Sequence, residues 1–380
     1  MATARTALLA ALIAALASGC GDDPDPPPTS EPTTGIAKAE GSEPIVGVSE
    51  PSAWRREPPP ASPDEIASLI ASLGATSHRW VVDWNLVEPR PPVEGHDYEF
   101  GPFDAMYAAD LSHGVRPLLV VLNAPAWAAD PGAVTGSFAN NPPAEDRLSD
   151  WGDFVTAVAR RYPRALGVEV WNEPNQTDFW ASGSAAVRPD PVRYTQLLEA
   201  SYAAVKSVDP GLLVIGGALS PKQTPSPQGD IPAPAFAAAM YRAGAAAYLD
   251  AFSLHPYPGS GGVDQTLALI EQIRAAGDAI GARPPLWLTE VGVTTTGPYA
   301  VSEDEQAAAL VALCRAVSAA PDVDALYFHS LIEVPEAGFQ TGFGLTAQVP
   351  GGGLEAKPAF SALQAAIRTA PPGGRCGAPG

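Results

Sequence analysis

The chain has 380 residues, enough for one large domain or two ordinary ones, and a hydrophobic content of 46% supports a sizeable core. Its 42 acidic residues against 22 basic residues give a formal net charge of −20. Such a surface repels nucleic acid and anionic lipid, which excludes both as general partners and favours a neutral ligand.

The first twenty residues have the features of an export signal. Arg5 is the only charge before Cys20, and residues 8–16 form an apolar run too short to span a bilayer. Small residues at 17–19 precede Cys20, which resembles a bacterial lipobox with a lipidated cysteine. The alternative is an ordinary cleaved signal with an incidental cysteine.

Residues 21–43 are rich in Asp, Pro, Ser, Thr and Glu, a composition that predicts a disordered, extended tether. We therefore expect an exported protein of the cell envelope, held by a lipid on Cys20, or otherwise a secreted one. The tether and the lipid are the only contact with a membrane that the sequence predicts.

From residue 44 to about 370, short apolar segments alternate with helical patterns. We expect strands at 44–48, 77–84, 116–122, from 168 up to an Asn-Glu pair at 172–173, and at 212–215, 251–254, 286–289 and 324–329. We expect helices at 63–73, 103–113, 146–161, 191–208, 234–247, 263–280, 303–319 and 358–367. Ser62 is a plausible N-cap of the first helix, and Gly74 follows its end.

This alternation predicts a single (β/α)₈ TIM barrel over residues 44–370. The strand segments lack a clean period-2 pattern, as expected where helices cover a parallel sheet. A doubly wound open sheet is the structural alternative. No Gly-x-Gly-x-x-Gly follows the first strand, which argues against a dinucleotide-binding version.

Two interpretations are open for Cys314 and Cys376, which lie toward the end of the chain. Cys314 shares a helical face with Leu310 and Val317, which is typical of a core residue. Cys376 lies in a Gly/Pro-rich segment, 371–380, that we expect to be a flexible tail. In an exported protein the two cysteines could instead form a disulfide.

Several polar residues directly follow the predicted strands. Barrel enzymes carry their chemistry at this edge, the carboxyl ends of the strands. The residues are Arg79, Asp83, Asn123, Asn172, Glu173, His255, Tyr257, Glu290 and His329.

Two of these residues are glutamates on strands that face each other across the barrel mouth. Glu173 precedes Pro174, where a strand must end, and Glu290 ends the seventh strand before Gly292. Paired carboxylates suit glycosidic bond cleavage, in which one protonates the leaving oxygen and the other acts at the anomeric carbon. A separation of about 5–5.5 Å would correspond to a retaining mechanism.

The motifs around Glu173 and Glu290 resemble those of one group of enzymes. Trp171-Asn172-Glu173-Pro174 resembles the acid/base motif of clan A glycoside hydrolases, and the segment around Glu290 resembles their nucleophile strand. Arg79 and His255-Pro256-Tyr257 match as well, and residues 79–127 are similar to bacterial members of families 39 and 5. The resemblance covers roughly residues 45–370.

This resemblance implies that Glu173 is the general acid/base and Glu290 the nucleophile. Arg79 would keep Glu290 ionised, Tyr257 would donate to Glu290, and His255 would line the subsite beside Glu173. Asn172 could bind the sugar 2-hydroxyl, a contact that strengthens in the transition state.

Two positions depart from the pattern and leave the sugar preference open. Asn123 stands where family 5 has a histidine. Phe328 and His329 stand where a tryptophan often forms the bottom of the sugar-binding site. For sugar stacking, Trp84, Trp127 and Trp180 are candidates, with Trp180 favoured because it lies in the polar loop after Glu173. Core packing is the alternative for each tryptophan.

The sequence thus predicts a retaining glycoside hydrolase that acts on a neutral glycan, as a monomer, without metal or cofactor. Its five histidines are scattered, with no His-x-His pair and no Gly-rich phosphate cradle. Glu290 could instead be only an ion-pair partner of Arg79, and His255 and Tyr257 only core residues. The rival functions are a non-catalytic glycan-binding surface lipoprotein and a transglycosylase on the same barrel.

Overall fold

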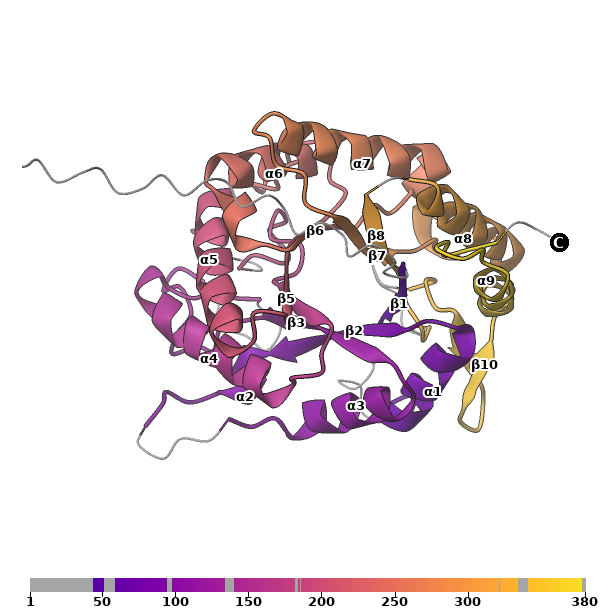
Figure 1. Ribbon diagram of the computed structural model, residues 1–380, viewed down its shortest axis with the longest axis horizontal. Helices are drawn as coiled ribbons and strands as arrows, with labels where there is room; N and C mark the ends of the chain where they lie inside the picture. The colour runs from indigo at the N-terminus through magenta and orange to yellow at the C-terminus, as the bar shows by residue number, and fades with distance from the viewer. Residues whose placement is uncertain are drawn as a thin grey trace, which may run out of the picture. The chain divides into compact units, whose positions relative to one another are not determined.

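The structure is a computed structural model, and it describes residues 44–50, 59–93, 98–133, 140–181, 184, 186–320, 322–333 and 341–377. Eight parallel strands close into a barrel in chain order, from β1 to β8, and helices surround them (Figure 1). The predicted (β/α)₈ barrel is therefore confirmed, and the open sheet is excluded. The expected export signal with Cys20 and the tether up to residue 43 lie outside the described residues.

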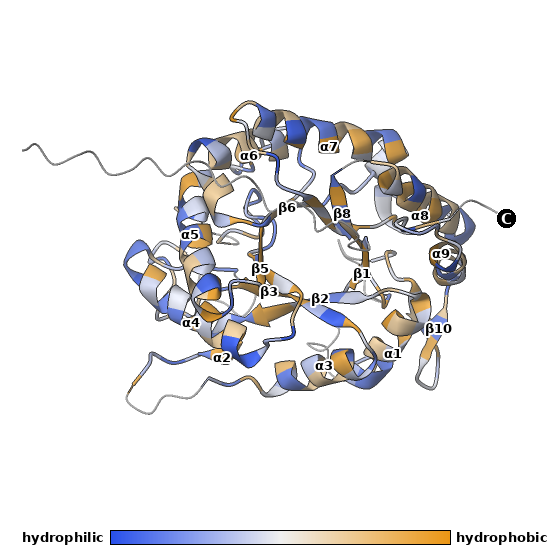
Figure 2. Ribbon diagram, in the orientation of Figure 1, coloured by the Kyte–Doolittle hydropathy of each residue, from blue (hydrophilic) through white to orange (hydrophobic). Residues whose placement is uncertain are grey.

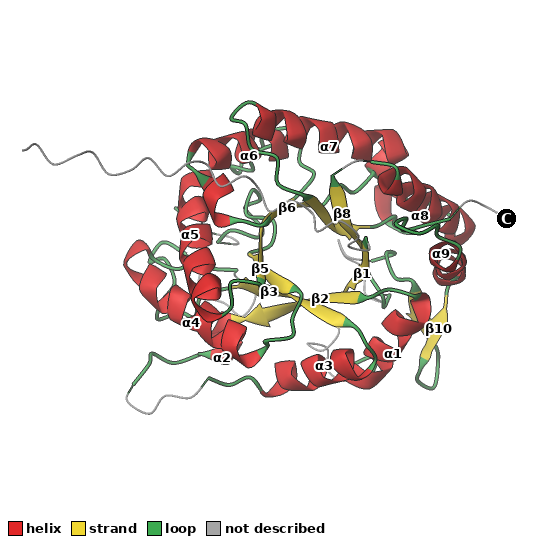
Figure 3. Cartoon of the chain, in the orientation of Figure 1, coloured by secondary structure: helices red, strands yellow, loops and turns green. Residues whose placement is uncertain are grey.

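The barrel strands are short and nearly all of their residues are buried, because the helices cover their outer face (Figure 3). The seam is closed by β1 and β8, where Gly47 lies opposite Tyr327 and Ser49 opposite His329. All eight carboxyl ends therefore meet at one rim. The strands are β1 Ile45–Ser49, β2 Ser77–Asp83, β3 Arg116–Leu122, β4 Gly167–Val170, β5 Leu213–Leu219, β6 Ala251–Leu254, β7 Leu286–Val291 and β8 Val323–His329.

The helices form a ring around these strands (Figure 3). Within the described ranges, none of them is long and apolar enough to cross a membrane. They are α1 Pro63–Leu73, α2 Trp84–Val87, α3 Gly101–Ser112, α4 Leu148–Arg161, α5 Pro191–Val208, α6 Ala233–Arg242, α7 Gly262–Asp278, α8 Glu303–Ser318 and α9 Pro358–Arg368. A small antiparallel pair, β9 Thr346–Gln348 and β10 Leu354–Ala356, lies between β8 and α9 and was not predicted.

Helix α1 ends where the sequence predicts. The hydroxyl of Ser62 accepts from the backbone N–H of Glu65, and the Glu65 side chain accepts from the N–H of Ser62 in return. Gly74 terminates the helix at φ 93°, a backbone conformation that glycine adopts without strain. Both predicted caps are confirmed.

Several predicted boundaries are wrong, and three of them coincide with a local structural feature. Asp83 caps the short helix α2, so β2 stops before Trp84. Gly244, at φ 93°, ends the predicted helix 234–247 early, and a 3₁₀ turn at Ala245–Tyr248 follows. Strand β5 continues past its predicted end at residue 215 to Leu219. It carries a register shift between Gly216 and Leu219, which the sequence pattern does not reveal.

The apolar core has two parts that alternate along the strands. One part lies between the barrel and the helices and includes Leu119, Leu288 and Leu326. The second includes Leu118 and Trp287, and it fills the inside of the barrel because alternate strand residues point to opposite faces. Figure 2 shows β3 in the hydrophobic colour, while the outer helices carry both colours.

The segment after α9 is held against the barrel unit, so the prediction of a flexible tail is wrong for residues 371–377. Cys376 forms a disulfide with Cys314 of α8. Arg375 is buried and donates to the backbone oxygen of Val323, and Arg315 donates to the backbone oxygen of Gly377 at 2.6 Å. Of the two readings left open for the cysteines, the structure therefore contains the disulfide.

Candidate active site

Glu173 is presented by a sharp turn directly after β4. The strand ends at Val170, and Trp171 and Glu173 then adopt positive φ values of 72° and 46°. Such values are uncommon outside glycine and cluster at functional sites, where the surrounding structure must hold them. The backbone N–H of Glu173 is held by the carbonyl oxygen of Ala218 at 3.0 Å.

A buried tyrosine fixes this turn to the neighbouring strand. The Tyr194 hydroxyl of α5 donates to the backbone oxygen of Val170 at 2.7 Å and accepts from the N–H of Gly217 at 2.7 Å. The hydroxyl of Ser253 accepts from the N–H of Ala218 at 2.7 Å. These side chains replace the ladder bonds that the irregular end of β5 lacks, so Glu173 stands on a rigid base.

Glu173 and Glu290 meet across the rim. Both residues are buried, at 5% and 7% exposure, and Glu290 lies one residue before the end of β7 at Val291. One carboxylate oxygen of each residue and one ring nitrogen of His255 all lie within 4.8 Å of one another. The structure therefore brings the predicted carboxylate pair together, with His255 beside both groups.

This group of three could also hold a metal ion on distance alone. The carboxylate of Glu290, however, already accepts two close hydrogen bonds, one at each oxygen, from Arg79 and Tyr257. A cation would have to displace the guanidinium or sit beside it. The donor set therefore suits acid–base chemistry better than metal binding.

Glu290 has a strongly anion-stabilising environment. The guanidinium Nη1 of Arg79 donates to Oε1 at 2.5 Å, and the Tyr257 hydroxyl donates to Oε2 at 2.6 Å. The Nδ1 atoms of His255 and His329 lie 3.6 and 3.9 Å from Oε2. Burial by itself raises the pKa of Glu290, but His255, His329, Arg79 and the Tyr257 hydrogen bond outweigh it and hold the pKa well below its ordinary value.

Arg79 is the permanent cation in this environment. It is fully buried in β2, and its Nε donates to Glu169 Oε2 at 2.5 Å while its Nη2 donates to Asn172 Oδ1 at 2.8 Å. Burial lowers the pKa of Arg79, but the charges of Glu169 and Glu290 outweigh burial and raise it above its ordinary value. The structure therefore pairs Arg79 with two glutamates, Glu169 and Glu290.

Two of these neighbours were not predicted. Glu169 lies inside the barrel on β4, and Ser49 at the end of β1 accepts from Arg79 Nη1 at 3.1 Å. A glutamate with no exposure in a four-residue strand signals a buried ion pair, which could have pointed to Glu169. For Ser49 the sequence holds no signal, because its contact depends on the register between β1 and β2.

We expect the change Tyr257→Phe to move the acidic limb of the kcat/KM profile to higher pH. The hydroxyl stabilises ionised Glu290, so its loss raises the pKa of Glu290, and the ionised form disappears earlier as the pH falls. A hydrogen bond to a charged group of about 1.5–3 kcal/mol corresponds to about one to two pH units. The measurement is kcat/KM across the acidic range.

Tyr299→Phe is the matched control for this change. Tyr299 follows β7 at the same rim but is 58% exposed, so its hydroxyl loss should leave the acidic limb in place. An acidic limb that is equal in the Tyr257→Phe enzyme and the wild type would contradict the role of Tyr257.

His255 and His329 occupy different positions at the rim. The Nδ1 atom of His255 lies 3.0 Å from Glu173 Oε1, and its ring is fully buried. His329 lies edge-on to Tyr257 and to Phe343, a residue that the sequence did not single out. Burial is the largest influence on His329 and lowers its pKa, so His329 is mainly neutral at neutral pH.

Phe343 reaches Tyr257 because the chain has a glycine after β7. A Cβ atom on Gly292 would lie 2.7 Å from the Phe343 ring and 2.5 Å from the backbone oxygen of His329. The ring centroids of Phe343 and Tyr257 are 5.5 Å apart in an edge arrangement. Phe343 therefore packs against the tyrosine that donates to Glu290.

Asn123 lies at the rim but is held by protein partners. Its backbone has φ 68°, its Nδ2 donates to Asp83 Oδ1 at 3.0 Å, and its Oδ1 accepts from the N–H of Asn141 at 3.2 Å. These bonds brace the loops after β2 and β3. The structure therefore gives Asn123 a bracing position in place of the predicted substrate contact.

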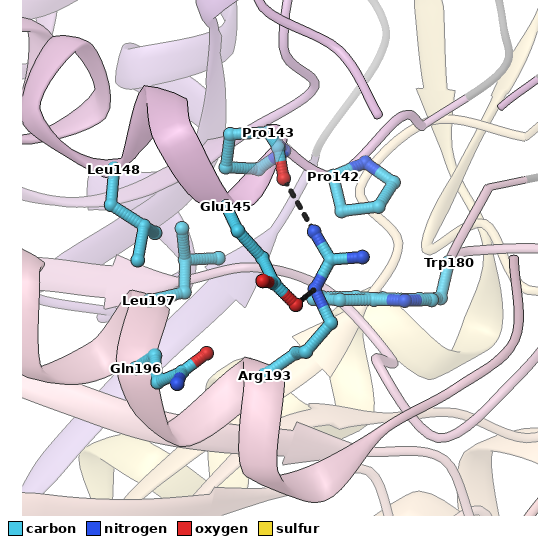
Figure 4. A pocket seen from close by; sticks show the side chains of 8 residues that line it. All are labelled: Pro142, Pro143, Glu145, Leu148, Trp180, Arg193, Gln196 and Leu197. Atoms are coloured by element: carbon cyan, nitrogen blue, oxygen red, sulfur yellow. Dashed lines mark hydrogen bonds and ion pairs between the residues drawn. The ribbon is translucent and has the colours of Figure 1, made fainter. Parts of the chain in front are cut away.

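The prediction that Trp180 is a sugar-stacking platform is wrong. Trp180 is 1% exposed and packs against Trp171 and Tyr194, with ring centroids 5.1 and 6.4 Å apart. Together with Arg193 and Pro143 it lines a small hollow (Figure 4). The volume of this hollow is about 10 Å³. A hollow this small holds at most one water molecule.

The other two tryptophans lie next to each other. Trp84 is fully buried and is therefore a core residue. Trp127 lies edge-on to Trp84 at 5.6 Å and is half-buried, with its indole N–H donating to the backbone oxygen of Glu88 at 3.0 Å. Of the three candidates, Trp127 is the one with a partly open ring.

Gln176 is a site residue that the sequence reasoning missed. Its side chain is 6% exposed, and its Nε2 donates to Oε2 of Glu173. The spacing of three residues is that of a turn, but a glutamine in a polar loop gives no sign of which way it points. Both carboxyl oxygens of Glu173 thus have a neighbour, His255 at Oε1 and Gln176 at Oε2.

Comparison with known proteins gives a family match whose range includes Arg79, Glu173 and Glu290. Residues 75–364 match the sequence profile of the family described as Glycosyl hydrolases family 39. A β-xylosidase of Geobacillus stearothermophilus is 28% identical over 130 residues, which is 32% of this chain and 25% of that protein. The alignment therefore spans about a quarter of that relative.

Two solved structures extend the comparison to the fold. A family 39 glycoside hydrolase of Bacteroides cellulosilyticus WH2 has a TM-score of 0.63 at 23% identity, over 85% of this chain and 63% of that one. A monomeric β-xylosidase of Caulobacter crescentus CB15 has a TM-score of 0.62 at 23% identity, over 85% and 69%. At these identities the likeness concerns the fold alone.

Proposed function

Because the chain belongs to the glycosyl hydrolases family 39, we propose that it is a retaining glycosidase that cleaves β-linked neutral sugars. One observation carries the proposal: Glu173 and Glu290 place carboxylate oxygens within 4.8 Å of each other across the barrel rim. Such a close approach of one oxygen from each group supports the carboxyl separation of about 5–5.5 Å of retaining enzymes over the about 6.5–9.5 Å of inverting ones.

In the first half of the proposed reaction, a carboxylate oxygen of Glu290 attacks the anomeric carbon. The bond from this carbon to the glycosidic oxygen breaks, and Glu173 gives its proton to the departing oxygen. Glu290 suits the nucleophilic role because its pKa is held well below its ordinary value, so it is ionised at neutral pH. Hydrogen bonds from Arg79 and Tyr257 orient it.

In the second half, Glu173 takes a proton from water, and the water oxygen attacks the anomeric carbon. The ester bond to Glu290 breaks, and the sugar leaves with its original configuration. Glu173 stands on the rigid turn after β4, next to His255 and Gln176, which supports the repeated proton transfer. Asn172, held by Arg79, lies beside Glu173 in the chain and is the proposed partner of the sugar 2-hydroxyl.

A neutral sugar is the substrate class that the charges favour. Arg79 is the cation that touches Glu290, and its donors are already used by Glu169, Ser49 and Asn172 as well. A sugar carboxylate would be repelled by ionised Glu290 and would find the donors of Arg79 already used. The similar proteins from Geobacillus and Caulobacter are β-xylosidases, which makes β-xylosides the first substrates to test.

Export, a lipid anchor on Cys20 and a monomeric state are part of the same proposal. The Cys314–Cys376 disulfide supports export, because such bonds persist in oxidising compartments. The Caulobacter β-xylosidase is described as monomeric, which supports a monomer here.

The test is turnover of a panel of aryl β-glycosides, beginning with the β-xyloside, with the product anomer followed by NMR. We expect release of the aryl group and a first-formed sugar of β configuration. A first-formed α anomer would contradict the double displacement. Binding without turnover across the panel would favour the glycan-binding lipoprotein, and transfer to an added sugar acceptor would favour the transglycosylase.

A further inference from the structure

We propose that Gln176 is a positioning residue that holds the carboxyl group of Glu173 through both halves of the reaction. The inference rests on the proposed function and extends it. Gln176 is buried at 6% exposure, and its Nε2 donates to Glu173 Oε2. The backbone N–H of Gln176 also donates to the carbonyl oxygen of Glu173 at 3.0 Å, so the two residues share one tight turn.

The backbone beneath Gln176 is fixed from both sides. The N–H of Trp180 donates to the backbone oxygen of Gln176 at 2.9 Å. The preceding residue, Asn175, is fully buried and donates to the backbone oxygen of Ile231 at 3.0 Å. The following residue, Thr177, donates from its backbone N–H to Asp230 Oδ1 at 2.9 Å. The backbone of Gln176 therefore cannot shift away from Glu173 without breaking these bonds.

The amide group of glutamine matches what Glu173 must do. In the proposed cycle Glu173 is a carboxylic acid before the first step and a carboxylate after it. A carboxylate only accepts hydrogen bonds, whereas a carboxylic acid also donates one. The glutamine amide carries both an NH₂ donor and a C=O acceptor, and a rotation of about 180° exchanges them. Gln176 can therefore hold either form of Glu173.

His255 alone does not provide this match. It lies on the other carboxyl oxygen of Glu173, at 3.0 Å, and its Nδ1 is also 3.6 Å from Glu290. The histidine is thus shared between the two carboxylates, while the Gln176 amide faces Glu173. An apolar residue at 176 would fill the same space and leave Oε2 of Glu173 without its partner.

The experiment compares Gln176→Leu and Gln176→Met with Thr177→Val as the matched control. Thr177→Val removes one hydrogen bond from the same turn but does not touch Glu173. We expect both Gln176 variants to lower kcat/KM by about 10- to 100-fold on aryl glycosides with poor leaving groups. The loss should be smaller for leaving groups that need no proton. The basic limb of the profile should move to higher pH, because the carboxylate form loses its donor.

The controls decide between this role and a purely structural one. Thermal unfolding identifies any variant that fails to fold, and having two variants of different shape guards against a packing defect in either. If a folded Gln176 variant keeps the wild-type pH profile and leaving-group dependence, or if Thr177→Val changes them equally, the inference is overturned. Absence of turnover in the wild-type protein would instead contradict the proposed function itself. This failure is therefore distinguishable from a failure of the inference about Gln176, which concerns the variants alone.

Discussion

Replacing Glu290 with alanine is expected to reduce kcat by roughly 10⁴-fold or more. The proposed covalent step needs an anion at this position, and water is a poor substitute for an oriented carboxylate. Azide fits the space that the lost carboxylate leaves, so added azide should restore part of the turnover and yield an α-glycosyl azide. The measurement is kcat with and without azide, with the product identified by NMR.

Two further variants make this result specific. Glu290→Gln keeps the shape of the side chain without its charge and should also be inactive, whereas Glu303→Ala removes a half-exposed carboxylate of α8 and should retain activity. Thermal unfolding belongs in the same experiment, because Arg79 loses an ion-pair partner in the Glu290 variants. A folded Glu290→Ala protein with wild-type activity would exclude Glu290 as the nucleophile.

Replacing Glu173 with alanine is expected to cost about 10²- to 10⁴-fold in kcat/KM for substrates with poor leaving groups, the usual contribution of a general acid. Aryl groups that leave as stable anions need no proton, so their first step should be nearly unaffected. For these substrates the second step becomes slow, because no base activates the water, and a burst of released aryl group should precede a low steady rate. Leaving-group dependence and the burst amplitude are the measurements.

Asp178→Ala is the control for this loop, because Asp178 is an exposed carboxylate five residues after Glu173. It should leave both the leaving-group dependence and the burst unchanged. An equal loss for good and poor leaving groups in Glu173→Ala would assign Glu173 to a role other than proton transfer.

The main features of the fold and the reactive pair could be predicted because their signals are local. Each strand is a compact apolar run, and the polar residue that ends it lies at the rim whatever the exact register. The motif around Glu173 and the strand ending at Glu290 also carried the resemblance to family 39, which the profile match confirms.

The contacts that tune the pair could not be predicted, because they depend on side-chain direction. Glu169 reaches Arg79 only because β2 and β4 both point these side chains into the barrel. Gln176 contacts Glu173 in a turn where Trp171 and Glu173 take positive φ values, and the sequence pattern does not predict these values. The prediction that Trp180 stacks on sugar is wrong because a tryptophan in a polar loop can still fold back into the core.

The disulfide of α8 makes the stability of the fold depend on the redox state of the surroundings. Cys314 and Cys376 are 62 positions apart, and the interval contains His329 and Phe343, which lie against the tyrosine that donates to Glu290. In the chain-entropy account, closing a loop of this length stabilises a fold by about 4 kcal/mol. Thiol reductants would therefore lower the free energy of unfolding without touching either carboxylate, and the protein should be less durable in a reducing cytosol than outside the cell.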